Sequence, residues 1–160
     1  MHSSRSRVCV YCGSRSGAQP AYKEAARALG RGLANHGIGL IYGGGAAGLM
    51  GALADAALAE NGEVIGVIPR ALFKRDLAHI GLSELIVVDD MPQRKAQMAA
   101  RAQAIIGLPG GLGTLEEMSE VLSWAQLDLH DKLICLLNVD GYFDALISFL
   151  RQAVIADFLQ

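Results

Sequence analysis

Short apolar runs alternate along the chain with longer segments whose apolar residues recur at helical spacing. The short runs, rich in Val, Ile, Leu and Tyr, predict strands over 7–11, 38–42, 64–68, 85–88, 104–108 and 133–137. The longer segments predict helices over 20–35, 49–60, 93–103, 115–127 and 142–158. Such alternation is typical of parallel βαβ units. We therefore expect a Rossmann-like α/β fold, doubly wound, with helices on both faces of a mainly parallel sheet.

The candidate binding and catalytic residues mostly follow the predicted strands. Ser14, Gly43 and Gly110 each follow a strand, and Arg94 stands at the start of a helix that a strand feeds. In an open parallel sheet, ligands bind outside the carboxyl ends of the strands. We expect these residues to converge on one edge of the sheet.

Length and composition limit the number of domains and the kinds of partner. The 160 residues suit a single domain over 1–160. The net charge of −2 supplies no basic field of the kind that nucleic acids or anionic membranes attract. Segment 32–54 lacks charged residues and is long enough to span a bilayer, but its glycines, with Asn35 and His36, argue against that. The N-terminus lacks the apolar region of a signal peptide, so we expect a cytoplasmic protein that binds neither nucleic acid nor membrane.

Cys9 and Cys12 have the C-x-x-C spacing of redox and zinc sites. Redox pairs sit at a helix start, whereas Cys9 falls inside a predicted strand, and no second ligand pair for zinc is evident. His36, His79 and His130 show no metal-ligand spacing. We therefore predict a buried strand cysteine, a loop cysteine and no metal site.

Residues 43–48 match the G-x-G-x-x-G fingerprint of dinucleotide-binding enzymes. That fingerprint also needs an acidic residue at the end of the next strand, where this chain has Pro69 and Arg70. Arg70 could meet a 2′-phosphate, which keeps an NADP-dependent oxidoreductase as a minor alternative. The other interpretation is a tight glycine turn beneath a close helix.

The sharper signal is Pro109-Gly110-Gly111-Leu112-Gly113-Thr114. It ends an Ile-rich strand and feeds a helix whose free N–H groups and dipole attract an anion. Thr114 and Glu117 also have the spacing of a capping box, in which Glu117 would only stabilise the helix start. The adjoining Glu116 leaves open that one carboxylate caps while the other faces the ligand. No Gly-Lys-Ser/Thr follows, so ATP hydrolysis is not expected.

Arg94 and Lys95 stand at the start of a predicted helix, where the macrodipole disfavours cations by some tenths of a kcal/mol. A functional role is one explanation for them. The other is two solvated surface cations on a helix that also carries Arg101.

Taken together, segments 42–45, 91–95 and 109–117 resemble the LOG ("lonely guy") family of cytokinin riboside 5′-monophosphate phosphoribohydrolases. The resemblance covers nearly the whole chain, including segments 8–14, 124–127 and 137–142. The P-G-G-x-G-T-x-x-E and R-K motifs are specific in combination. Members are often labelled lysine decarboxylases, but that chemistry needs a cofactor-anchoring lysine. The chain has no distinct candidate for one, and the resemblance implies no cofactor.

The resemblance implies a cytokinin-activating enzyme that hydrolyses the N-glycosidic bond of AMP and N6-prenylated AMP, releasing the base and ribose 5-phosphate. Arg94 and Glu117 would be its catalytic pair. A carboxylate would stabilise oxocarbenium charge on the ribose and position or deprotonate water, while Arg94 would hold the substrate or assist the leaving purine. The substrate-binding positions it implies are Ser14, Gly44, Gly45, Asp76, Lys95, Gly110, Gly111, Gly113, Thr114, Leu115 and Glu116.

Three differences from the family stand out. Asp76 replaces the usual Glu, which shortens an expected substrate contact by one methylene, and Gln103 replaces the usual Asp. Family members usually continue beyond the position of Gln160 into another strand and helix, so the chain is expected to lack that last unit. An alternative from another class is a non-catalytic nucleotide-binding or carrier protein, which the presence of both Arg94 and Glu117 disfavours.

The helix predicted over 115–127 has apolar residues on more than one face, among them Met118, Leu122 and Trp124. This pattern predicts that part of the helix is buried against a second subunit in a homodimer. The other interpretation is a helix buried wholly within its own domain.

Overall fold

Strands and helices alternate through the computed structural model, which describes residues 6–73 and 77–159. The strands are β1 (Arg7–Tyr11), β2 (Gly39–Tyr42), β3 (Val64–Pro69), β4 (Glu84–Val88), β5 (Ala104–Gly107) and β6 (Leu133–Leu136). The helices are α1 (Pro20–Asn35), α2 (Gly48–Ala59), α3 (Arg70–Phe73), α4 (Met91–Ala100), α5 (Leu112–Gln126) and α6 (Asp144–Ile155), with a 3-10 turn η1 (Val139–Gly141).

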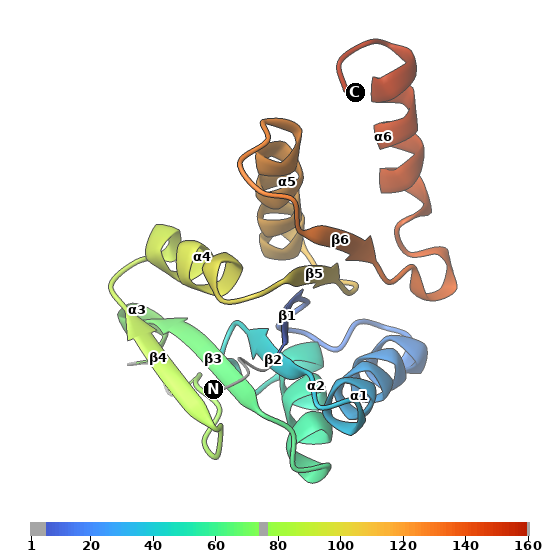
Figure 1. Cartoon of the computed structure of the whole chain (residues 1–160). Coiled ribbons are helices and arrows are strands. Elements are labelled where there is room, and N and C mark those ends of the chain that lie inside the picture. The colour runs from blue at the N-terminus through green and yellow to red at the C-terminus, as the bar shows by residue number, and fades with distance from the viewer. Residues whose placement is uncertain (1–5, 74–76, 160) are drawn as a thin grey trace.

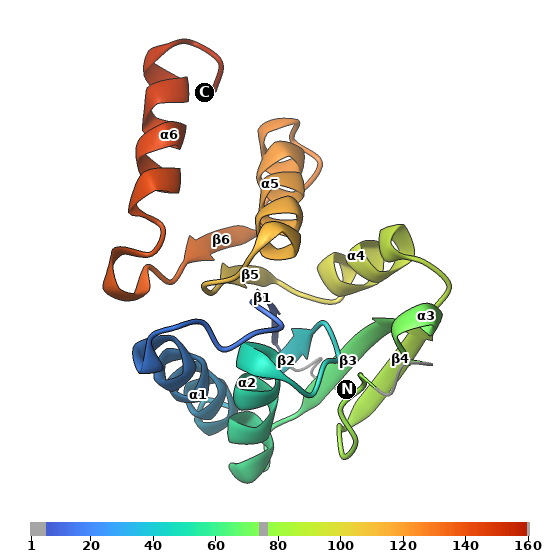
Figure 2. The ribbon, with the colours of Figure 1, turned by 180° about the vertical axis from the view of Figure 1, so that it is seen from behind.

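All described strands join one parallel sheet in the order β4-β3-β2-β1-β5-β6. Helices α1 and α2 cover one face, and α4 and α5 cover the other (Figures 1 and 2). The chain leaves β1 toward α1 on one face, and it leaves β5, the neighbour of β1, toward α5 on the opposite face. The predicted doubly wound fold is confirmed. Its switch point, where such folds bind ligands, lies between β1 and β5.

Each face of the sheet has its own apolar core, because successive strand residues point to opposite faces. Val10, Leu40 and Leu53 belong to the core beneath α1 and α2. Ile105 and Met118 belong to the core beneath α4 and α5. Burying each such side chain contributes about 1.5–3 kcal/mol, so the two layers together hold the sheet edge in a fixed shape.

The two cysteines of the C-x-x-C pair lie in different cores. Cys9 is buried in β1 on the α4 and α5 face, whereas Cys12 is buried just beyond β1 on the α1 and α2 face. Both are free thiols. The prediction of a buried strand cysteine and a loop cysteine is confirmed.

Helices α4 and α5 begin earlier than predicted, and this changes the position of their functional residues. Helix α5 begins at Leu112 rather than 115, with Gly111 as its N-cap and no side-chain capping bond. Thr114 therefore lies inside the helix, and the capping-box interpretation of Glu117 is wrong. Helix α4 begins at Met91 rather than 93, because Asp90 accepts a hydrogen bond from the Gln93 N–H (2.8 Å).

Helix α6 stands apart from the sheet beside α5 (Figures 1 and 2). It is shorter than the predicted helix over 142–158 because η1 and a turn precede it. An apolar groove of about 980 Å³ separates α5 from α6, with Leu115, Met118 and Leu122 on one side and Ile147 and Phe149 on the other. None of the described residues of α6 is buried.

Candidate active site

A pocket of about 520 Å³ lies at the carboxyl edge of the sheet, beside the switch point between β1 and β5. Arg94, Thr114, Glu117 and Ser14 provide its polar side chains. Its apolar wall consists of Met50, Ile68, Leu72, Leu77 and Met91. The groove between α5 and α6 is larger, but this pocket combines apolar walls with converging charged groups, which is typical of a ligand site.

The loop after β5 leaves free N–H donors at one end of this pocket. A hydrogen bond from Gly13 N to Pro109 O (3.0 Å) ties the loop to the end of β1. The N–H groups of Gly111, Leu112 and Gly113 have no backbone partner among the described residues. Free N–H groups at a helix start attract anions. The loop therefore joins a strand to a helix start with free N–H groups, as the sequence predicted.

Thr114 closes over this loop. Its side chain is buried, and a Cβ added to Gly110 would lie only 2.0 Å from Thr114 Oγ1. No larger residue fits at 110 without moving Thr114.

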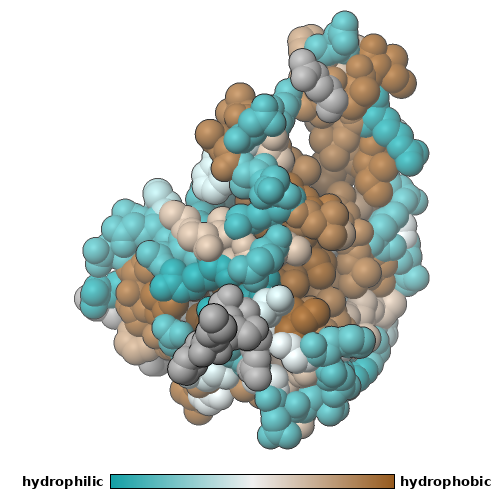
Figure 3. Space-filling view, in the orientation of Figure 1, coloured by the Kyte–Doolittle hydropathy of each residue, from teal (hydrophilic) through white to brown (hydrophobic). Residues whose placement is uncertain are grey.

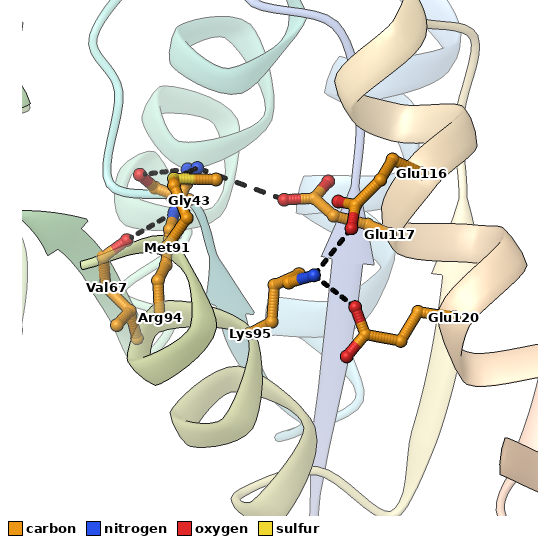
Figure 4. A network of polar contacts seen from close by, with 8 residues as sticks. All are labelled: Gly43, Val67, Met91, Arg94, Lys95, Glu116, Glu117 and Glu120. Atoms are coloured by element: carbon orange, nitrogen blue, oxygen red, sulfur yellow. Dashed lines mark hydrogen bonds and ion pairs between the residues drawn. The ribbon is translucent and has the colours of Figure 1, made fainter.

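Arg94 is buried and held by the main chain (Figure 4). Its Nε donates to the carbonyl of Val67 (3.0 Å), and its Nη2 donates to the carbonyl of Gly43 (2.7 Å). Val67 lies two residues before the end of β3, and Gly43 directly follows β2. The guanidinium is thereby fixed as a positive charge at the sheet edge, with Nη1 directed toward Glu117.

Gly43 is needed for this arrangement. A Cβ at Gly43 would lie 1.9 Å from Arg94 Nη2. Because Gly43 has no side chain, the guanidinium of Arg94 can approach its backbone closely.

Glu117 lies one turn into α5 from Thr114 and is 8% exposed. Its Oε1 is 3.9 Å from Arg94 Nη1, which is an ion pair without hydrogen-bond contact. Burial raises the pKa of Glu117 to about 7; Arg94 opposes this rise, and Glu116 adds to it. A carboxyl that titrates near neutral pH in a cleft is a strong candidate for acid–base or electrostatic catalysis.

Lys95 points away from Arg94 and joins α4 to α5 (Figure 4). Its Nζ donates to Glu116 (2.5 Å) and also to Glu120. The Glu116 and Glu120 carboxylates, in that order, raise the pKa of Lys95. The two helices that carry Arg94 and Glu117 are therefore connected by a second set of ion pairs.

The structure divides those predicted substrate-binding residues that it describes into four groups. The pocket is lined by Ser14, Gly45, Gly111, Gly113 and Thr114. Gly44 and Gly110 support its loops from behind, and Lys95 and Glu116 bond to each other beside it. Leu115 turns away and lines the groove toward α6. Asp76 lies outside the described residues.

Sequence reasoning missed the apolar wall of the pocket. Met50, Ile68, Leu72, Leu77 and Met91 come from separate elements, and none stands out from other apolar residues in the chain. Of these five residues, only Met91 lies in a recognisable sequence motif, because it stands three residues before Arg94 in segment 91–95. Its sulfur lies 3.7 Å from Arg94 Nη1.

The described parts of the chain offer neither a metal-ligand cluster nor a membrane span. In residues 6–73 and 77–159, no group of three or more His, Cys, Asp or Glu side chains is placed to hold a metal ion. None of the helices described is both long and apolar enough to cross a membrane.

Comparison with known proteins shows which group of enzymes the chain resembles. The family model described as "Possible lysine decarboxylase" matches residues 50–160. Over 153 residues the chain is 50% identical to the cytokinin riboside 5′-monophosphate phosphoribohydrolase LOG7 of Arabidopsis thaliana, covering 96% of this chain and 70% of LOG7. It is 49% identical to the probable cytokinin riboside 5′-monophosphate phosphoribohydrolase LOGL6 of Oryza sativa subsp. japonica, covering 96% of this chain and 61% of LOGL6.

Solved structures support the fold. The molybdenum cofactor binding protein from Rippkaea orientalis superposes with a TM-score of 0.74 at 24% identity, covering 97% of this chain and 86% of that protein. At this identity the likeness concerns the fold alone.

Proposed function

The chain belongs to the LOG family of cytokinin riboside 5′-monophosphate phosphoribohydrolases, and from this membership we propose that it hydrolyses the N-glycosidic bond of adenosine 5′-monophosphates, including N6-prenylated ones. The products are the free base and ribose 5-phosphate. The observation that carries the proposal is the buried Arg94–Glu117 pair beside a helix start with free N–H groups.

The substrate's phosphate binds at the start of α5. Gly111, Leu112 and Gly113 offer unpaired N–H groups there, and Thr114 adds a hydroxyl. Glu117 follows Thr114 by about one helical turn, a rise of about 5 Å. This spacing suits one ribose ring between the phosphate and the carboxyl. The apolar wall, with Ile68 and Leu77, then faces the base and its N6 substituent.

Glu117 and Arg94 divide the chemistry between them. As the glycosidic bond breaks, positive charge develops on the ribose, and an ionised Glu117 stabilises it and orients the attacking water. Nε and Nη2 of Arg94 donate to main-chain carbonyls, whereas Nη1, which also contacts the Met91 sulfur, is directed toward Glu117 and the substrate. Arg94 also favours the ionised form of Glu117.

The family model's description as a lysine decarboxylase does not fit Lys95, the lysine that follows Arg94 in α4. A lysine that forms a Schiff base is activated by a lowered pKa. Lys95 has the opposite environment, because its bonds to Glu116 and Glu120 raise its pKa. We assign Lys95 the task of holding α4 against α5.

A direct assay tests the proposal. The protein is incubated with AMP and with isopentenyladenosine monophosphate, and free base is followed by chromatography. Release of base from either substrate supports hydrolysis. A folded protein that binds AMP saturably but releases no base would instead be a non-catalytic nucleotide carrier.

We further propose that the protein acts in the cytoplasm as a homodimer. The groove between α5 and α6 is lined by apolar side chains, and Figure 3 shows apolar residues gathered over this part of the surface. Leu115 and Phe149 are 43% and 66% exposed there. Exposed apolar patches of this kind mark protein interfaces. The groove adjoins the active site through α5, because Leu112 lines the pocket one turn before Leu115.

A further inference from the structure

The turn between β6 and α6 has a constrained shape to which the proposed chemistry assigns no role. Asp140 (φ 48°) and Gly141 (φ 74°) both adopt the left-handed conformation. Apart from glycine, Asp and Asn are the residues that adopt this conformation most readily. Asn138 secures the turn, since its Oδ1 accepts from the Phe143 N–H (2.7 Å) and its Nδ2 donates to Asp144 (2.7 Å).

This turn places Tyr142 behind the phosphate-binding loop. The Tyr142 hydroxyl donates a hydrogen bond to the carbonyl of Gly110. Its ring makes edge contacts with Tyr22 (5.5 Å between centroids) and Phe143 (5.1 Å). The ring position and the hydroxyl direction are therefore both fixed by neighbours.

The hydrogen bond from Tyr142 orients a whole peptide unit, that is, the Gly110 carbonyl together with the Gly111 N–H. In a trans peptide unit, the C=O of one residue and the N–H of the next point in opposite directions, and the described chain has no cis peptide bond. With the Gly110 carbonyl turned toward Tyr142, the Gly111 N–H is turned away from it. Gly111 lines both the active-site pocket and an adjoining cavity of about 300 Å³, whereas Tyr142 lines that cavity and not the active-site pocket.

We propose that Tyr142 is a positioning residue, whose hydroxyl holds the Gly110–Gly111 peptide so that the Gly111 N–H is aimed at the substrate's 5′-phosphate. This inference rests on the proposed function, because it requires a phosphate at the start of α5. Tyr142 itself does not touch the substrate. Its effect is on phosphate affinity rather than on the chemical step.

The test compares Tyr142→Phe with Tyr22→Phe. Each variant loses one hydroxyl from the same aromatic cluster, and the Tyr22 hydroxyl has no hydrogen bond among the described residues. KM and kcat are measured for AMP, and the Kd of ribose 5-phosphate is measured by calorimetry. Tyr142→Phe is expected to raise KM and Kd about fivefold, the factor that corresponds to one net hydrogen bond. Its kcat should stay near the wild-type value, and Tyr22→Phe should match wild type throughout.

Two results would overturn the proposal. One is a Tyr142→Phe protein with wild-type KM and Kd. The other is an equal change in both variants, which would assign the effect to packing of the aromatic cluster. A merely structural role would lower the unfolding temperature without weakening ribose 5-phosphate binding. If wild type releases no base from AMP, the proposed function fails, while the ribose 5-phosphate measurement still tests the role of Tyr142.

Discussion

Nη1 of Arg94 lies 3.9 Å from Oε1 of Glu117, and more than nine-tenths of each side chain is buried. Because no direct hydrogen bond joins them, Glu117 keeps its oxygens for a substrate or water. The Glu117→Gln variant keeps the shape but cannot ionise. We expect kcat to fall by about 10²–10⁴, the usual contribution of a catalytic carboxyl, with AMP binding retained.

Glu116→Gln is the matched control for this variant. It removes the neighbouring carboxylate, which is more exposed and is bonded to Lys95 beside Glu120. We expect at most a small change in kcat. If Glu117→Gln hydrolyses AMP at the wild-type rate, Glu117 has no catalytic role.

The pH dependence of activity should follow Glu117, whose pKa burial raises to about 7. If the ionised carboxylate is the active form, kcat/KM increases as pH rises through 7 and levels off above it. Glu116 raises the pKa of Glu117, and Lys95 lowers it. Glu116→Gln should therefore move the inflection to lower pH, and Lys95→Met should move it to higher pH. An inflection that neither variant moves would belong to another group.

The same pKa shift predicts a pH-dependent cost in stability. The pKa of Glu117 rises from its ordinary 4.5 to about 7 in the folded protein. Between these values the folded state binds more protons than the unfolded state, so this residue destabilises the fold progressively as pH rises from about 4.5 to 7. Relative to wild type, the free energy of unfolding of Glu117→Gln should increase by up to about 3 kcal/mol as pH rises through this window. The basis is 1.36 kcal/mol for each unit of pKa shift. Urea unfolding at pH 4.5 and 8 measures the difference, and equal differences at both values would contradict the assignment.

Much of the fold could be predicted because its signals are local. The predicted strand over 7–11 and helix over 20–35 coincide with β1 and α1, since apolar runs and Pro20 mark these boundaries within a few residues. The start of α5 was missed for a physical reason. The Thr114 and Glu117 spacing imitates a capping box, but the loop before it is tied to Gly13 and Tyr142 by long-range hydrogen bonds.

The residues of the candidate site were easier to predict than their contacts. Arg94 was singled out from its motif, yet it is held by carbonyls of Val67 and Gly43, 27 and 51 residues away. Every residue has a main-chain carbonyl, so the sequence does not indicate which carbonyls will accept hydrogen bonds from Arg94. The Lys95 bonds to Glu116 and Glu120 likewise depend on how α4 packs beside α5.

Gly43 tests whether the placement of Arg94 matters. In Gly43→Ala, the added methyl would lie 1.9 Å from Arg94 Nη2 and displace the guanidinium from the Gly43 carbonyl. We expect kcat/KM for AMP to fall by at least about tenfold, since a buried hydrogen bond to a charged group is worth about 1.5–3 kcal/mol. Gly32→Ala is the control, because a methyl added there would have no described atom within 4 Å beyond its own helix backbone and chain neighbours, and helix α1 should tolerate it. Full activity in Gly43→Ala would show that the exact position of Arg94 is unimportant.

The apolar groove beside the site predicts the oligomeric state. Phe149 is 66% exposed on α6 and lines the groove opposite Leu115 of α5. A buried charge without a partner is costly at an interface, so Phe149→Glu should convert a dimer to a monomer. Light scattering after size-exclusion chromatography measures the mass.

Ile80→Glu is the control, because Ile80 is 90% exposed and lies outside the groove. This variant should remain dimeric. A wild-type protein with monomeric mass would refute the dimer, and a dimeric Phe149→Glu protein would place the interface elsewhere. Since Leu112 of the pocket lies one turn of α5 before Leu115 of the groove, a monomeric variant should also show altered KM for AMP.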